Sequence, residues 1–155
     1  MTVAKILKLI TILEKIYNIY QEIYALGEEK KDFIIGQEIE LLEETVQKEE
    51  SLLSKITKLE EKRIELVGER SLSELMNNLD SNYGEKLNDI KGKLTKLVVD
   101  LEGLNQLNNQ LIKDSLYLTN LNLNLLTKNK DQGTYGKKGR LSKQNNGNSF
   151  INHKA

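Results

Sequence analysis

Paired carboxylates are the side chains of this sequence with the most obvious potential for chemistry. Two neighbouring acids can serve as general acid and base or can hold a divalent cation. Here the pairs alternate with lysines, which is typical of the solvated face of a long helix. We therefore interpret them as surface groups, at Glu28-Glu29, Glu43-Glu44, Glu49-Glu50 and Glu60-Glu61.

Other catalytic chemistries lack the residues they need. The chain has no cysteine, and its only histidine, His153, stands two residues before the last residue. A di-metal helical bundle would require Glu-x-x-His on its helices. The glycines between residues 133 and 139 do not follow a strand, as a phosphate-binding loop would. We predict no enzymatic activity, no catalytic residue, no metal and no cofactor.

The elements that would position any site are helices. The chain has 155 residues, 38% hydrophobic and 30% charged, with no proline, which suits one domain of long surface helices. Apolar residues three and four apart predict helices over residues 2–33 and 37–67. Between them Gly36, a residue that tolerates a positive φ, interrupts the pattern, and a tight connection there predicts that the two helices form an antiparallel hairpin.

Two capping patterns precede the remaining elements. Ser71 with Glu74 predicts a short connector helix over residues 71–79, and Asn82 with Glu85 opens a long helix over residues 82–127. The predicted fold is all-α, an antiparallel long-helix bundle or coiled coil of three main helices within residues 1–128. Residues 129–155 are basic and poor in apolar residues, and they are predicted to form a disordered tail.

The third long helix is too long for the hairpin. Residues 82–127 would span about 70 Å as a helix, against about 46 Å for residues 37–67. From Asn108 onward one of its seam positions also becomes polar, at Asn108, Ser115 and Asn122, while the other stays leucine. We expect coverage to end near residue 111, beyond which the leucines face water. They would suit the amphipathic helix of a partner, or equally self-association through the same leucines.

Several segments of this region resemble one protein family. The sequence reads LNQLNNQLI at 104–112, SLY at 115–117 and LNLNLLT at 121–127, followed by TYGKKG at 134–139. These segments, in this order, resemble the C-terminal helix and the tyrosine-glycine signature of FlgN-family flagellar export chaperones. The earlier helices resemble the family only as acidic coiled-coil pattern.

The resemblance implies a function and a set of site residues. It implies a chaperone that binds the C-terminal region of the hook–filament junction proteins FlgK and FlgL, blocks premature assembly and delivers them to the export apparatus. The implied docking residue for the export gate protein FlhA is Tyr135. The implied client-binding residues are Asn105, Asn108, Leu111, Leu118, Leu121 and Leu125.

Hydropathy and charge argue against a membrane, secreted or nucleic-acid-binding protein. No apolar run approaches the roughly 20 residues of a membrane helix, and the first 12 residues lack a signal peptide's continuous core. We expect a cytoplasmic protein without stable membrane insertion. The basic tail offers only Tyr135 and Phe150 for stacking on bases, so we do not predict nucleic-acid binding.

Overall fold

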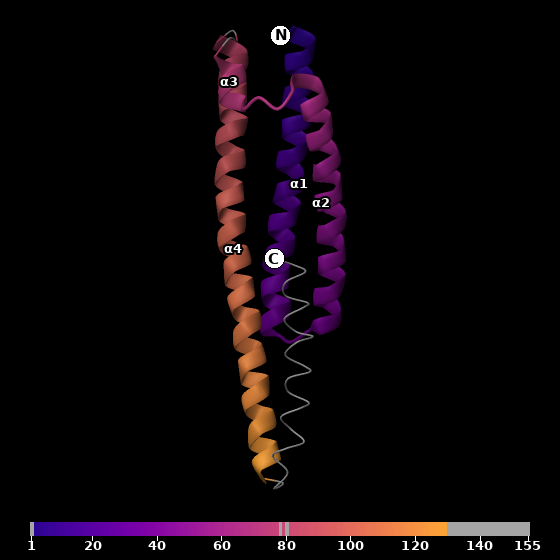
Figure 1. Cartoon of the computed structure of the whole chain (residues 1–155), viewed down its shortest axis with the longest axis vertical. Coiled ribbons are helices and arrows are strands. Elements are labelled where there is room, and N and C mark those ends of the chain that lie inside the picture. The colour runs from indigo at the N-terminus through magenta and orange to yellow at the C-terminus, as the bar shows by residue number, and fades with distance from the viewer. Residues whose placement is uncertain (1, 78, 80, 130–155) are drawn as a thin grey trace.

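The structure, a computed structural model, describes residues 2–77, 79 and 81–129, which form four α-helices and no strand. The helices are α1 (Val3–Ile35), α2 (Ile39–Val67), α3 (Leu72–Met76) and α4 (Ser81–Asn129) (Figure 1). The predicted all-α class with three long helices is confirmed. The connector helix is shorter than the expected 71–79. Of the expected tail, only Asn129 lies within the described residues, as the last residue of α4.

Side-chain caps fix the start of two helices. Thr2 has extended backbone angles, and its hydroxyl accepts a hydrogen bond from the backbone N–H of Lys5 at 3.3 Å. Ser71 caps α3 in the same way, accepting from the N–H of Glu74 at 3.2 Å, as the sequence pattern predicts. The cap expected at Asn82 is wrong, because α4 begins at Ser81 and a capping residue must lie outside the helix.

The turn between α1 and α2 places its positive φ on Gln37 and not on Gly36. Gly36 has φ −79°, and the positive φ falls on Gln37, at 56°. The N–H of Gln37 donates to the Ile34 carbonyl at 3.2 Å, and that of Glu38 donates to the Phe33 carbonyl at 2.9 Å. This pair of bonds is the Schellman motif, which requires a left-handed residue directly after the C-cap. Because α1 continues to Ile35, that position belongs to Gln37.

The three long helices lie side by side with α1 between the other two (Figure 1). The chain descends through α1, returns through α2, and descends again through α4, so α2 is antiparallel to α1 while α4 is parallel to it. The large interfaces are those of α1 with α2 and of α1 with α4. The short α3 packs on the first turns of α4, where the Lys91 ammonium donates to the Ser73 hydroxyl at 2.6 Å.

All four helices contribute to one apolar core at the end where the chain begins. Leu9 of α1 and Leu87 of α4 are fully buried there. Burying a leucine stabilises a fold by about 1.5–3 kcal/mol, so this end anchors the bundle. The core consists of Ile6, Leu9, Ile10, Leu13, Val67, Leu75, Leu87 and Ile90.

Polar contacts join the helices nearer the α1–α2 turn. The Lys30 ammonium of α1 lies 2.6 Å from a Glu49 carboxylate oxygen of α2, and both side chains are buried. On the other side of α1, the Asn108 amide nitrogen of α4 donates to the Gly27 carbonyl at 3.0 Å. A buried polar group is stable only when its partner is in place, so these contacts favour one register of each helix pair.

Candidate interaction surface

The last part of α4 extends beyond the helix against which it packs. Leu104 and Asn108 lie beside Gly27 of α1. In this register Ile35, eight residues after Gly27, is level with about residues 112–116 of α4. The helix continues to Asn129, about 20–25 Å further, and Figure 1 shows it passing the α1–α2 turn. We call residues 116–129 the α4 extension.

One stripe of leucines runs from the packed part of α4 into this extension. Leucines recur every seven residues at 104, 111, 118 and 125, a spacing that keeps them on one side of a helix. Leu104 is 7% exposed, Leu111 is half-buried, and Leu118 and Leu125 are 57% and 62% exposed. The same stripe that α1 covers upstream therefore lies open downstream.

Leu121 completes an exposed apolar face. It stands three residues after Leu118 and four before Leu125, and it is 39% exposed. Residues at these separations are neighbours on a helix surface. Leu118, Leu121 and Leu125 are called the leucine face below. It unites three of the six residues that the family resemblance implies for client binding.

The other three implied residues lie elsewhere. Asn105 is exposed but sits about 140° around the helix from Leu118 at 100° per residue. Asn108 is only 3% exposed and bonds to α1, which gives it a role inside the molecule. Leu111 lies at the margin between covered and open helix. Tyr135 lies outside the described residues.

The structure also exposes apolar residues that the sequence analysis did not place in the site. Tyr117 and Leu126 are 64% and 59% exposed next to the leucine face, and Ile35 and Ile39 flank the turn at 65% each. Tyr117 and Leu126 each adjoin a stripe leucine in sequence. For Ile35 and Ile39, the signal was a pair of isoleucines around the Gly36-Gln37 turn.

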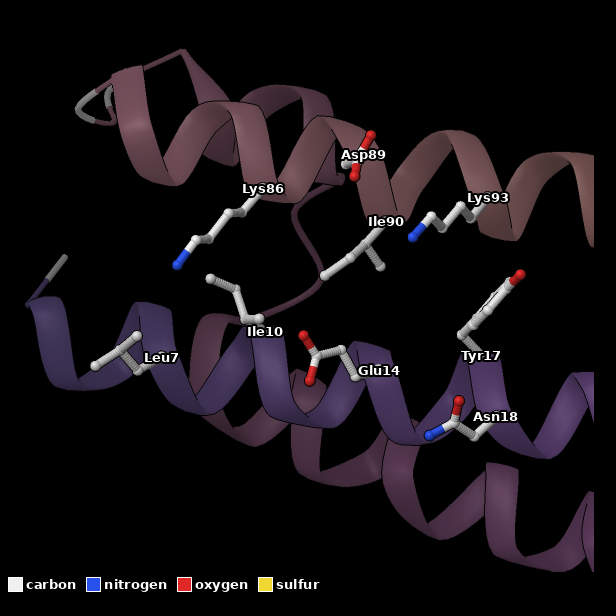
Figure 2. Close-up of a pocket in the computed structure, with 9 residues that line it drawn as sticks. All are labelled: Leu7, Ile10, Glu14, Tyr17, Asn18, Lys86, Asp89, Ile90 and Lys93. Carbon is white, nitrogen blue, oxygen red and sulfur yellow. The ribbon is translucent and has the colours of Figure 1, made fainter.

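A cleft of about 480 Å³ lies at the opposite end, between the first halves of α1 and α4 (Figure 2). Lys86 and Lys93 extend from α4 toward α1, and Glu14 lies between them on α1. These charges are of both signs, and the cleft contains no nucleophile paired with a base. Within the described part of the chain, no group of three His, Cys, Asp or Glu could hold a metal.

Three ionisable groups of α1 with shifted pKa values form a small surface network. The pKa of the Glu28 carboxyl is lowered, mainly by the hydrogen bond that the Lys31 ammonium donates to it at 3.0 Å. The same bond raises the pKa of Lys31. Partial burial raises the pKa of the Tyr24 hydroxyl, and the Glu28 charge adds to the effect. This network lies on the surface of α1, where it serves as a helix-face ion pair.

One known protein family matches most of the chain. The chain matches the model of the family described as FlgN protein over residues 1–143. The match includes all of the helices and continues past the end of α4. The chain belongs to the FlgN family.

FlgN is a family of flagellar export chaperones and not of enzymes, so membership assigns this FlgN chain a general chaperone role in flagellar export. No curated protein and no solved structure matches the chain. Among residues 2–77, 79 and 81–129, no helix is long and apolar enough to cross a membrane. The most prominent exposed apolar surface of α4 in this FlgN chain is the leucine face.

Proposed function

We propose that this FlgN chain is a cytoplasmic chaperone that holds the C-terminal helical region of FlgK and FlgL against the leucine face of α4. The observation that supports this is the leucine stripe, which is buried against α1 as far as Leu104 and open from Leu118. An amphipathic client helix lying beyond the end of α1 would cover the stripe as α1 does upstream. The client would take the place that α1 leaves vacant.

The mechanism follows from covering apolar surface. Client helices that assemble with one another expose apolar faces, and a chaperone that buries those faces blocks assembly without any covalent step. Delivery requires a second contact, for which the family resemblance implies Tyr135 and the export gate protein FlhA. Release would then follow from competition at the gate. No cofactor takes part.

Calorimetric titration with the C-terminal helical segments of FlgK and FlgL tests the proposal. We expect saturable binding, retained in a chain truncated after residue 128. The double substitution Leu118→Asp with Leu125→Asp removes two leucines that would each contribute about 1.5–3 kcal/mol on burial. Affinity should therefore fall at least about 100-fold.

Val99→Asp provides the matched control. Val99 is 59% exposed on the same helix but lies within the part that packs on α1. The substitution also replaces an exposed apolar side chain by a carboxylate, but away from the leucine face, so the affinity for FlgK and FlgL should stay within about twofold of the native value. If the folded double variant binds both clients as tightly as the native chain, the leucine face is not the client site.

Self-association through the leucine face is the alternative, because exposed leucines fit a second copy as well as a client. It predicts an oligomer whose mass rises with concentration in the absence of client and which Leu118→Asp disrupts. Sedimentation velocity over a range of concentrations distinguishes the two. A client-free oligomer together with no FlgK or FlgL binding would favour a structural coiled-coil role.

A further inference from the structure

A second open surface lies along the α1–α2 hairpin. Three adjoining hollows form a continuous groove between these helices, and α4 contributes no residue to its lining. Leu7 and Ala25 line it and are exposed, whereas the six other apolar lining residues are half-buried and recur every seven residues on each helix. These six are Ile12, Ile19 and Leu26 on α1 and Leu52, Leu59 and Leu66 on α2.

The rim of this groove is strongly basic. Glu22 is the one carboxylate among its lining residues, and within the described part of the chain none of its lysines forms an ion pair. Residues 1–129 as a whole carry 17 Lys and Arg against 22 Asp and Glu, so the groove is positive on an acidic molecule. The lysines are Lys8, Lys15, Lys48, Lys55, Lys58 and Lys62. We call this surface the lysine-rimmed groove.

Its dimensions suit a helix. The groove runs from Leu7 to Leu26 on α1 and from Lys48 to Leu66 on α2. These stretches have 20 and 19 residues, or about 30 and 28 Å of helix. Apolar stripes that repeat every seven residues on two adjacent helices form the holes that receive the side chains of a third helix.

We infer that the lysine-rimmed groove binds an acidic amphipathic helix of another protein, about five turns long. The apolar face of that helix would bury the floor, and flanking Glu or Asp side chains would pair with the rim lysines. This surface is on different helices from the leucine face. The inference therefore does not depend on client binding by α4.

Charge and shape exclude the other occupants. The chain's own residues 130–155 carry six Lys and Arg against one Asp, so they would be repelled by the rim. A second copy using the same groove would set lysines against lysines. A membrane surface requires apolar side chains that project from the protein, whereas six of the eight apolar lining residues are half-buried between two helices.

The probe for the test is a synthetic peptide of about 21 residues with Leu at the seam positions and Glu at the flanking positions of each heptad. Fluorescence anisotropy of the labelled peptide with the full chain should give saturable one-to-one binding. The affinity should fall between about 50 mM and 500 mM salt because the rim charges are screened. A peptide with Lys in place of Glu should not bind.

Charge reversal locates the binding site. Lys15→Glu with Lys55→Glu should weaken binding of the acidic peptide roughly tenfold or more. The matched control is Lys86→Glu with Lys93→Glu, which changes the net charge equally but in the α1–α4 cleft of Figure 2. That control should leave peptide affinity unchanged, and circular dichroism should show both variants folded.

Four results would overturn the inference. The first is that the acidic peptide shows no saturable binding, and the second is that both lysine-pair variants weaken peptide binding equally. The third is that Leu118→Asp with Leu125→Asp abolishes peptide binding. The fourth is that the chain binds phosphatidylserine vesicles more strongly than the peptide, in a way that depends on Lys15 and Lys55. The third would place the peptide on the leucine face. The fourth would make the groove a membrane-binding surface. FlgK and FlgL binding is measured on the same variants, so failure of either proposal is recognised separately.

Discussion

Asn108→Leu should stabilise this protein, although it removes a buried hydrogen bond. The bond from the Asn108 amide to the Gly27 carbonyl contributes about 0.5–1.5 kcal/mol net. The Asn108 Oδ1 atom is buried without a hydrogen-bond partner among the described residues, a state that costs about 1–3 kcal/mol. Leucine would remove that cost and would add about 1.5–3 kcal/mol of apolar burial.

Steric strain reduces this gain. Leucine branches at Cγ as asparagine does, but its Cγ is tetrahedral and not planar, and a misfit in a packed interface costs about 1–3 kcal/mol. The expected net change is a rise of about 1–3 kcal/mol in the free energy of unfolding. Urea unfolding followed by circular dichroism at the helix band measures this change. The m-value, which is the dependence of the unfolding free energy on urea concentration, should be the same for the variant and the native chain.

Asn105→Leu is the control for the intrinsic helix preference of leucine. Asn105 lies three residues away on the same helix and is exposed, so it reports the change in propensity of about 0.5 kcal/mol without the burial. If Asn108→Leu is destabilised by more than about 1 kcal/mol relative to Asn105→Leu, the hydrogen bond outweighs the apolar gain. The buried Asn108 Oδ1 would then not carry the energetic cost assigned to it.

Three further outcomes are expected. Gln37→Gly should raise stability by about 0.5–1 kcal/mol in urea unfolding, because glycine adopts the left-handed conformation without steric cost; a loss would contradict the turn geometry. Glu49→Ala alone should lower the free energy of unfolding by about 3–5 kcal/mol in urea unfolding, because it leaves the buried Lys30 ammonium unpaired. Lys30→Met combined with Glu49→Leu should leave that free energy nearly unchanged. Equal losses for both variants would show that the ion pair itself is strongly stabilising. Tyr135→Ala should leave FlgK and FlgL titrations unchanged and weaken FlhA binding; unaltered FlhA affinity would remove Tyr135 from the docking site.

Much of the architecture follows from local sequence pattern. Apolar residues at helical spacing, with no proline to interrupt them, indicate the three long helices, and the Ser71 cap is recognisable from its own hydroxyl and the following Glu74. The different lengths of the helices imply that the third extends past the hairpin. These features depend on a residue and its neighbours within one or two turns, which is the range over which sequence pattern is informative.

The details of the candidate site were less predictable. Asn105 and Asn108 have the same side chain and lie one turn apart, yet one is exposed and the other is buried against Gly27. The seam pattern separates Asn108 from Asn105, but only the position of α1 decides that the seam is still covered at Asn108. The position of positive φ at Gln37 likewise depended on whether α1 ended one residue earlier or later.

By itself, the sequence determined that this chain is helical, that α4 extends past the helix hairpin and that leucines recur up to the end of α4. Helix periodicity and rise per residue are local properties, so sequence pattern is enough to show them. Only the tertiary structure decided which leucines are covered. It set α1 beside α4 as far as Ile35, leaving Leu118 and Leu125 open, and it left the lysine-rimmed groove uncovered on the far side of the hairpin. Burial is a relation between segments distant in the chain, so it exists only once they pack together.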